Sequence, residues 1–246
     1  MKTEWDYTNL ADAYLKRPDY ALDVIDKMIT KSGVAKGERV CDVGAGTGHL
    51  TRLLVSKGLK VTAVEPNDAM RNNGVMVTKE MGVNWFEGTG EDTRQEARTY
   101  KLVTFGSSFN VCDRQKTLTE VKRILQSQGW FACMWNHRDL LDLIQKDVEG
   151  IIKSNIEGYS YGTRREDQTA VIDQSGLYGE VTYLEGSHTV DVNVVDYIEA
   201  WRSHATLERQ AGANFYKIIS EIEQYLAGKE SIPVPYTTRL WMAQLK

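Results

Sequence analysis

The stretch VCDVGAGTGHLT, residues 40–51, decides the fold, because an apolar run leads directly into three glycines and then into a helical pattern. Gly44, Gly46 and Gly48 permit a tight turn after the apolar run. They also let backbone N–H groups and the start of the next helix come close to a ligand. The stretch therefore predicts a strand, a glycine loop and a helix that together bind a nucleotide-like cofactor.

An acidic residue follows at the distance at which dinucleotide-binding folds hold a ribose. Glu65 ends the next apolar run 21 residues after Gly44, and the spacing in such folds is about 20 residues. The G-x-G-x-x-G pattern of nicotinamide-binding proteins requires a glycine at position 49, where this chain has His49. A nicotinamide-dependent oxidoreductase is therefore the less favoured interpretation of the loop.

Short apolar runs alternate with helical patterns through the first 135 residues, which is typical of βαβ units and a parallel sheet. We expect strands at 39–43, 60–64, 83–86, 101–106 and 130–135. Beyond residue 136, strand-like runs at 180–192 and 234–245 flank helical segments near 193–210 and 214–227. The pattern predicts one α/β domain over 1–246, with a doubly wound, mostly parallel seven-stranded sheet and a small helical cap or insertion at about 136–215.

Composition excludes several classes of protein. With 41% apolar and 26% charged residues, the chain has the composition of an ordinary packed domain. A formal net charge of −4 and the lack of a lysine- or arginine-rich tract argue against nucleic acid as a partner. The sequence has no apolar run of membrane-spanning length and no apolar core for a signal peptide. We expect a cytoplasmic protein, monomeric or homodimeric, that does not bind membranes.

The cysteines give no sign of a metal site or a disulfide framework. Cys41, Cys112 and Cys133 are odd in number and form no C-x-x-C pair. Two of them lie in apolar runs, where cysteine usually acts as a small buried hydrophobe. We therefore expect no bound metal.

The glycine loop also carries a family resemblance. Asp42 precedes the first glycine of a G-x-G-x-G pattern at 44–48, and the chain resembles the class I S-adenosylmethionine (SAM)-dependent methyltransferases, whose fold is Rossmann-like. EPNDAM at 65–70, GTGED at 88–92 and GSSFNVCD at 106–113 resemble further segments of that family, so the resemblance covers at least residues 7–136. It implies SAM as the cofactor and S-adenosylhomocysteine (SAH) as its product.

The resemblance also implies which residues surround SAM. Asp42 and the glycine loop would lie at the methionine part, Glu65 at the ribose, and the segments that follow at the adenine. The full implied set is Asp42, Gly44, Ala45, Gly46, Glu65, Pro66, Met70, Gly90, Glu91 and Gly106. Glycine stands at 90 where alanine is commoner in the family, which matters little if the backbone makes the contact.

Within the class, the chain looks most like the type 11 group that contains trans-aconitate-methyltransferase-like enzymes. The segment from Tyr14 to Tyr20 resembles the group's Y-x-x-R-P-x-Y pattern, Trp135 to Asp139 resembles its W-N-x-R-D turn, and PYTT at 235–238 resembles its carboxy-terminal strand. The fold of this group serves many acceptors, so the resemblance does not identify a substrate.

The expected reaction is methyl transfer to a small metabolite by in-line displacement, with an oxygen acceptor favoured and an anionic metabolite as one option. Because the sulfonium of SAM is already an activated donor, the protein needs chiefly to position the acceptor and exclude water. His137 is the first candidate to orient the acceptor or take its proton, and His204 is the second. The expected acceptor-lining residues are Tyr14, Arg17, Asn110, His137 and Arg202, with Arg202 as an anchor for an anionic group. A noncatalytic SAM-binding or partner-binding protein of the same fold stays an alternative.

Overall fold

The computed structural model describes residues 7–246, which form one seven-stranded sheet in the order β3-β2-β1-β4-β5-β7-β6. The neighbouring strands from β3 to β5 pair in parallel, and β7 runs antiparallel to both β5 and β6. The expected α/β, mostly parallel seven-stranded sheet is confirmed. The strands are β1 (Arg39–Val43), β2 (Lys60–Val64), β3 (Asn84–Phe86), β4 (Tyr100–Gly106), β5 (Leu125–Arg138), β6 (Thr182–Asn193) and β7 (Ser231–Gln244).

Ten α-helices lie among the described residues, and their positions along the chain follow the alternation seen in the sequence. The first half contains α1 (Ala11–Tyr14), α2 (Leu22–Ser32), α3 (His49–Ser56), α4 (Asp68–Val77) and α5 (Arg114–Ile124). The second half contains α6 (Leu143–Asn155), α7 (Thr169–Gln174), α8 (Val194–Arg202), α9 (Ala205–Ala211) and α10 (Phe215–Tyr225). Short 3₁₀ turns lie at η1 (Thr8–Leu10), η2 (Phe109–Val111), η3 (Gly162–Arg165) and η4 (Gly212–Asn214).

Helices cover both faces of the sheet, which is the doubly wound arrangement. Successive residues of a strand point to opposite faces, so Val40 packs with α2 and α3 on one face while Cys41 packs with α5 on the other. On β5, Ala132 and Cys133 divide between the same two clusters. The near-continuous apolar strands of the sequence result from this double coverage.

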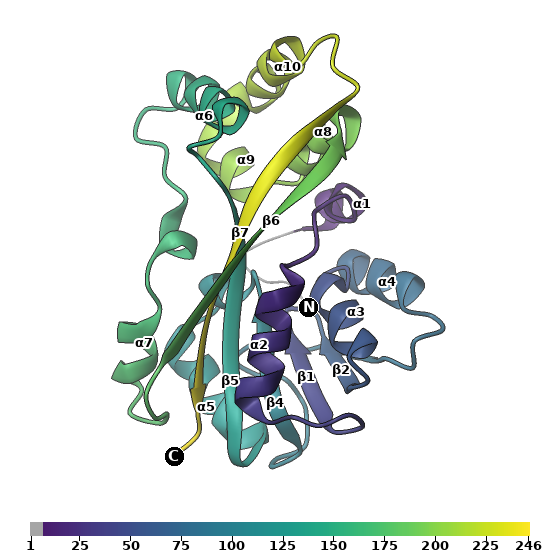
Figure 1. The fold of residues 1–246 in the computed structure, drawn as a ribbon, viewed down its shortest axis with the longest axis vertical. Coiled ribbons are helices and arrows are strands. Elements are labelled where there is room, and N and C mark those ends of the chain that lie inside the picture. The colour runs from purple at the N-terminus through teal and green to yellow at the C-terminus, as the bar shows by residue number, and fades with distance from the viewer. Residues whose placement is uncertain (1–6) are drawn as a thin grey trace.

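A third apolar cluster forms a cap beyond the end of the sheet. It joins α6, α8, α9 and α10 to the first residues of β7, which extends from the sheet into the cap together with β6 (Figure 1). This cluster runs from Val148 to Tyr236, past the expected boundary at 215, whereas Ile172 and Tyr178 pack into the main core. The boundary of the cap or insertion at about 136–215 stays a prediction.

The fifth strand is longer than its sequence pattern predicts. The expectation was 130–135, but β5 continues to Arg138, because Asn136, His137 and Arg138 pair with Thr238, Thr237 and Tyr236 of β7. His137 and Arg138 therefore lie on a strand rather than in the turn expected after it. Among residues 7–246, no helix is both long and apolar enough to cross a membrane.

Candidate functional site

The glycine loop connects β1 to α3 at the carboxyl edge of the sheet, and two of its glycines are required by geometry. Gly44 has φ +64°, and a Cβ there would lie 2.4 Å from Cβ of Ser108. Gly46 has φ +57°, and a Cβ there would lie 3.2 Å from Cε of Met70. Both backbone angles are in the region that glycine alone adopts readily. The loop is thus held in a conformation that keeps its surface free of side chains.

Glu65, directly after β2, holds this loop in place. Its Oε2 accepts a hydrogen bond of 2.9 Å from the N–H of Gly46, and its Oε1 accepts one of 2.8 Å from the N–H of Asn67. Burial raises the pKa of the Glu65 carboxyl to about 7, and the two N–H donors oppose that rise. A carboxylate that is buried, yet faces a cavity, gains further stabilisation from hydroxyl donors of a ligand.

The cavity in front of Glu65 has a volume of about 720 Å³, and we call it the Glu65 pocket. Its walls combine the glycine loop with apolar side chains and the turn after β4. They include Tyr7, Tyr14, Gly44, Gly46, Glu65, Pro66, Met70, Gly90, Glu91, Gly106, Ser107, Val111 and Cys112. This mixture of polar and apolar groups suits a nucleoside.

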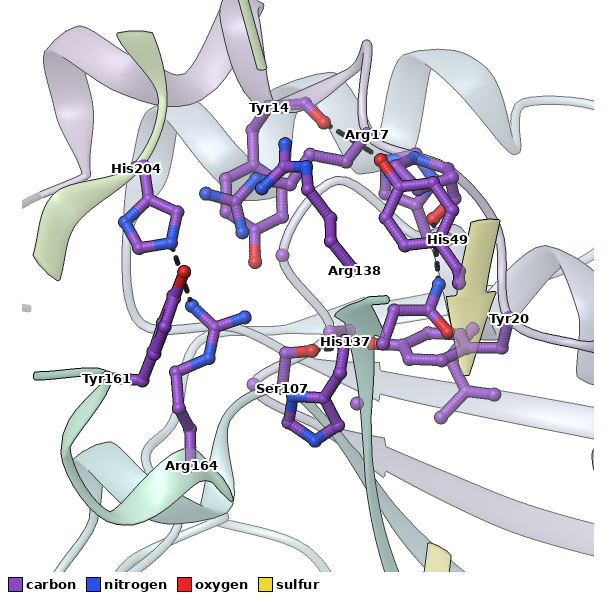
Figure 2. A pocket seen from close by; sticks show the side chains of 18 of the residues that line it. Tyr14, Arg17, Tyr20, His49, Ser107, His137, Arg138, Tyr161, Arg164 and His204 are labelled. Atoms are coloured by element: carbon purple, nitrogen blue, oxygen red, sulfur yellow. Dashed lines mark hydrogen bonds between the residues drawn. The ribbon is translucent and has the colours of Figure 1, made fainter. Parts of the chain in front are cut away.

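A second cavity of about 880 Å³ is also lined by the glycine loop, and we call it the His137 pocket (Figure 2). It lies between the sheet edge and the cap, with walls from β5, η3 and the segment before α9. They include Tyr14, Arg17, Tyr20, Asp42, Gly44, Ala45, Gly46, Gly106, Ser107, Asn136, His137, Arg138, Tyr161, Arg164, Arg165, His204 and Tyr236. Five wall residues, Tyr14, Gly44, Gly46, Gly106 and Ser107, belong to both pockets.

Asp42, on β1, is fully buried at the base of the His137 pocket. Its two oxygens accept hydrogen bonds of 2.7 Å from the hydroxyl of Thr51 and 3.0 Å from that of Thr104. Burial raises the pKa of this carboxyl to about 6, although both hydroxyls favour its ionised form. Asp42 therefore ties β1 to β4 and α3 directly beneath the loop.

His137 is buried in a strongly positive environment. Neither ring nitrogen has a hydrogen-bond partner among the described residues. Burial, followed by the charges of Arg164, Arg165 and Arg239, lowers the pKa of His137 to about 2. The imidazole is thus neutral at physiological pH and a weak base, although it can still donate or accept a hydrogen bond.

His204 lies across the same pocket and is also buried. Its Nδ1 accepts a hydrogen bond of 3.1 Å from the N–H of Leu207, at the start of α9, and its Nε2 lies 3.1 Å from Nη1 of Arg164. Burial and the neighbouring arginines hold the pKa of His204 well below its usual value. Nδ1 of His204 thus caps the amino terminus of α9, and the imidazole also lines the His137 pocket.

The segment that contains Tyr14 and Arg17 contributes to the walls of the pockets. Arg17 stacks on the ring of Tyr14 at 4.0 Å, and its Nε and Nη2 donate hydrogen bonds of 3.0 and 2.7 Å to Ser203. The backbone oxygen of Tyr14 lies 3.1 Å from Nε2 of His49, at the start of α3. These contacts fasten the segment both to the cap and to the glycine loop.

Most residues singled out from the sequence come together here. The ten expected cofactor residues all line one of the two pockets, as do Tyr14, Arg17 and His137. Asn110 accepts a hydrogen bond of 2.9 Å from Nε1 of Trp135 and lines a smaller cavity beside them. Whether these residues bind a cofactor or an acceptor stays a prediction.

Arg202 does not join this group. Its side chain is 45% exposed and bonds to Glu199 at 3.0 Å and Glu223 at 2.6 Å, and it lines none of the pockets described above. The expected placement of Arg202 as an anchor in the acceptor site is corrected, because its position on α8 pairs it with Glu199 and Glu223 outside the pockets.

Sequence reasoning did not select Asn136, Arg138 or Tyr236 as site residues, although each lines the His137 pocket. Their segments had been noted only for their resemblance to family patterns. No local pattern indicates their place in the site, because the pairing of β5 with β7 brings Arg138 opposite Tyr236.

Part of the chain is similar to a known protein family. Residues 41–133 match the model described as methyltransferase domain. An uncharacterized methyltransferase of Mycobacterium tuberculosis is 32% identical over 123 residues, which make up 50% of this chain and 48% of that protein. The chain thus spans about half the length of the curated relatives it matches.

Solved structures resemble this chain over most of its length, and at this level of identity they show the fold. A putative methyltransferase from an antibiotic biosynthesis pathway of Anabaena variabilis has a TM-score of 0.62 at 17% identity, covering 92% of this chain and 98% of that one. Phosphoethanolamine N-methyltransferase 2 of Haemonchus contortus, solved with phosphomonomethylethanolamine and SAH, has a TM-score of 0.52 at 14% identity, covering 91% of this chain and 52% of that one.

The likeness to trans-aconitate-methyltransferase-like enzymes stays a prediction. The match to a methyltransferase domain supports the broader resemblance, because the matched stretch contains the end of β1, the glycine loop, Glu65 and the strands β2 to β4. Residues 41–133 are thus similar to a methyltransferase domain, and they lie within a mostly parallel α/β sheet.

Proposed function

We propose that the protein is a SAM-dependent methyltransferase that transfers the methyl group to an oxygen of a small acceptor by in-line displacement. The observation that carries this proposal is the meeting of the two pockets at the glycine loop, where they share Gly44, Gly46, Gly106, Ser107 and Tyr14. A cofactor in one pocket and an acceptor in the other would face each other across this shared wall. In-line transfer requires that arrangement.

The residues of the Glu65 pocket fit SAM. Glu65 would accept hydrogen bonds from the ribose hydroxyls, Pro66 and Met70 would contact the adenine, and the bare glycine loop leaves room for the methionine part. When bound, SAM supplies an electrophilic methyl group on its sulfonium, and transfer breaks that S–C bond as the O–C bond forms, with the bonding pair left on sulfur.

The lining of the His137 pocket favours an oxygen acceptor over an amine. A protonated amine would meet four arginines in this wall, and Asp42, its carboxylate among residues 7–246, already accepts hydrogen bonds from two threonines. Since the pKa of His137 is lowered to about 2, we assign this residue an orienting hydrogen bond rather than proton removal. Such a site suits an acceptor oxygen that arrives already deprotonated.

The test works without a known acceptor. Purified protein would be incubated with SAM carrying a deuterated methyl group and with a pool of cell metabolites, and labelled products sought by mass spectrometry. We expect SAH to form together with one labelled compound whose label sits on oxygen, and neither to form with Gly46→Val. SAM binding without any SAH would favour a noncatalytic SAM-binding protein, and binding of NADH in place of SAM would favour an oxidoreductase.

A further inference from the structure

Four arginines line the His137 pocket without a carboxylate at ion-pair distance in the described part of the chain. Arg17, Arg138, Arg164 and Arg165 all contribute to its wall, yet none forms an ion pair with an acidic residue within 7–246. Figure 2 shows the side chains of Arg17, Arg138 and Arg164 around one cavity, with His137 and His204 beside them. Asp42, the carboxylate of this wall, is bonded to two threonines, and Glu149 acts on Arg165 without forming an ion pair, so positive charge is in excess in the pocket.

Arg164 is the clearest case. Its Nε is buried and has no hydrogen-bond partner in the described chain, and its Nη1 meets Nε2 of His204 at 3.1 Å. That imidazole is neutral and provides no charge compensation. Burial, reinforced by the charge of Arg17, lowers the pKa of Arg164 to about 10. The guanidinium is thus desolvated and retains free N–H donors.

Arg138 and Arg165 are similar, and aromatic rings hold them in place. Nε of each is buried without a partner among residues 7–246. The guanidinium of Arg138 lies 4.1 Å from the ring centre of Trp201, and that of Arg165 lies 4.2 Å from the ring centre of Tyr161. Stacking of this kind orients the planar group without using its hydrogen-bond donors, of which one, Nη2 of Arg165, donates to the carbonyl oxygen of Arg138 at 3.3 Å.

Such an arrangement destabilises the empty protein. Desolvating an unpaired charge opposes folding, and well-packed apolar side chains in its place are often more stabilising. A planar guanidinium with free N–H groups matches a carboxylate or a phosphate, which can accept two parallel hydrogen bonds from it. The missing counterion is therefore best supplied by a ligand.

We propose that the His137 pocket binds the acceptor as an anion, with a carboxylate or phosphate group held by Arg138, Arg164 and Arg165. This inference rests on the proposed function and adds the chemical class of the acceptor. Arg17 is excluded from the set because Ser203 already occupies its Nε and Nη2. The carboxylate of SAM itself would neutralise one positive charge at most, which leaves an excess for a second anion.

The test measures the binding of two simple anions in the presence of saturating SAH, which supplies the cofactor's own carboxylate. Malonate and inorganic phosphate would be titrated at constant ionic strength, with uncharged malonamide as the matched neutral probe. The variant is Arg164→Met, which keeps much of the side-chain volume without the charge. The control is Arg39→Met, because Arg39 is an exposed arginine at the start of β1, the opposite end of that strand from the pocket.

At least one anion should bind the wild type and Arg39→Met, whereas malonamide should not. Arg164→Met should bind that anion at least about tenfold more weakly, as expected for the loss of charge-assisted hydrogen bonds. Preference for malonate would identify a carboxylate, and preference for phosphate a phosphoryl group. The proposal is overturned if neither anion binds the wild type, or if Arg164→Met binds it with unchanged affinity.

Two further measurements separate this proposal from its alternatives. Without ligand, Arg164→Met should melt at or above the temperature of the wild type, because the variant removes an unpaired buried charge, whereas a purely structural arginine would give a lower value. If the variant does not fold, Arg165→Met takes its place in the same titration. The affinity for SAH is measured separately. If the wild type binds the anion but not SAH, the proposed function alone is refuted. If it binds SAH but not the anion, the anion site alone is refuted.

Discussion

Replacing Glu65 by glutamine tests the cofactor site with almost no change in side-chain shape. Each carboxylate oxygen accepts one backbone hydrogen bond, from Gly46 at 2.9 Å and from Asn67 at 2.8 Å. Glutamine has a single acceptor oxygen, so its NH₂ group would face one of these N–H donors. The variant therefore weakens the hold on the glycine loop and removes the charge that would meet the ribose hydroxyls.

The magnitude follows from the charged hydrogen bonds that are lost. A hydrogen bond to an ionised group contributes about 1.5–3 kcal/mol, and about 1.4 kcal/mol corresponds to a tenfold change in affinity. We therefore expect the Kd for SAH to rise ~10- to ~100-fold in Glu65→Gln. The melting temperature should change little by comparison, since the variant also removes a buried charge.

Isothermal titration calorimetry with SAH is the assay, at pH 8, because the pKa of Glu65 is raised to about 7 and the wild-type carboxyl must be ionised. Glu80→Gln is the control, since Glu80 is exposed in the turn that follows α4. A Kd for Glu65→Gln within about threefold of the wild-type value corresponds to a change in binding free energy of less than ~1 kcal/mol. That result would refute the assignment of Glu65 to the ribose.

Three further predictions concern the loop, the pH dependence of binding and the role of His137. Gly46→Val should fold but lose measurable SAH binding by calorimetry, because the new side chain would meet Met70 and the backbone φ of +57° is unfavourable for valine; normal binding would show that the loop is not the cofactor site. The ribose hydroxyls favour the ionised form of Glu65, whose pKa is raised to about 7 in the free protein. SAH affinity should therefore fall by up to about tenfold for each pH unit below 7. Glu65→Gln should remove this pH dependence, and an unchanged slope in the variant would contradict the prediction. His137→Gln should lower kcat by less than about tenfold, because the pKa of His137 is lowered to about 2. Loss of a general base would lower kcat ~10²–10⁴-fold. A loss of that size, measured with the acceptor that labelling identifies, would restore the role of His137 as a base.

The fold and the glycine loop could be predicted because their determinants are local. Three glycines, an acid before them and an acid after the next strand are all read along one βαβ unit, and Gly44, Gly46 and Glu65 do face one cavity. Apolar runs covered on both faces also located the strands β1, β2 and β4 to within a residue. These features depend on contacts between neighbours in the sequence.

The acceptor side of the site could be predicted only in part, because it is assembled from distant segments. Arg138 faces the pocket since β7, about a hundred residues later, extends the ladder of β5 beyond Trp135. Arg202 points away since its position on α8 places it beside Glu199 and Glu223. A sequence read one segment at a time contains neither relationship.

A crystal structure with bound SAH tests the central claim most directly. The account predicts ribose hydroxyls within hydrogen-bonding distance of Glu65, the adenine against Pro66 and Met70, and the sulfur at the shared wall formed by Gly44, Gly46 and Gly106, facing the His137 pocket. SAH bound elsewhere, or with its sulfur turned away from the His137 pocket, would contradict the proposal that the two pockets form one methyl-transfer site.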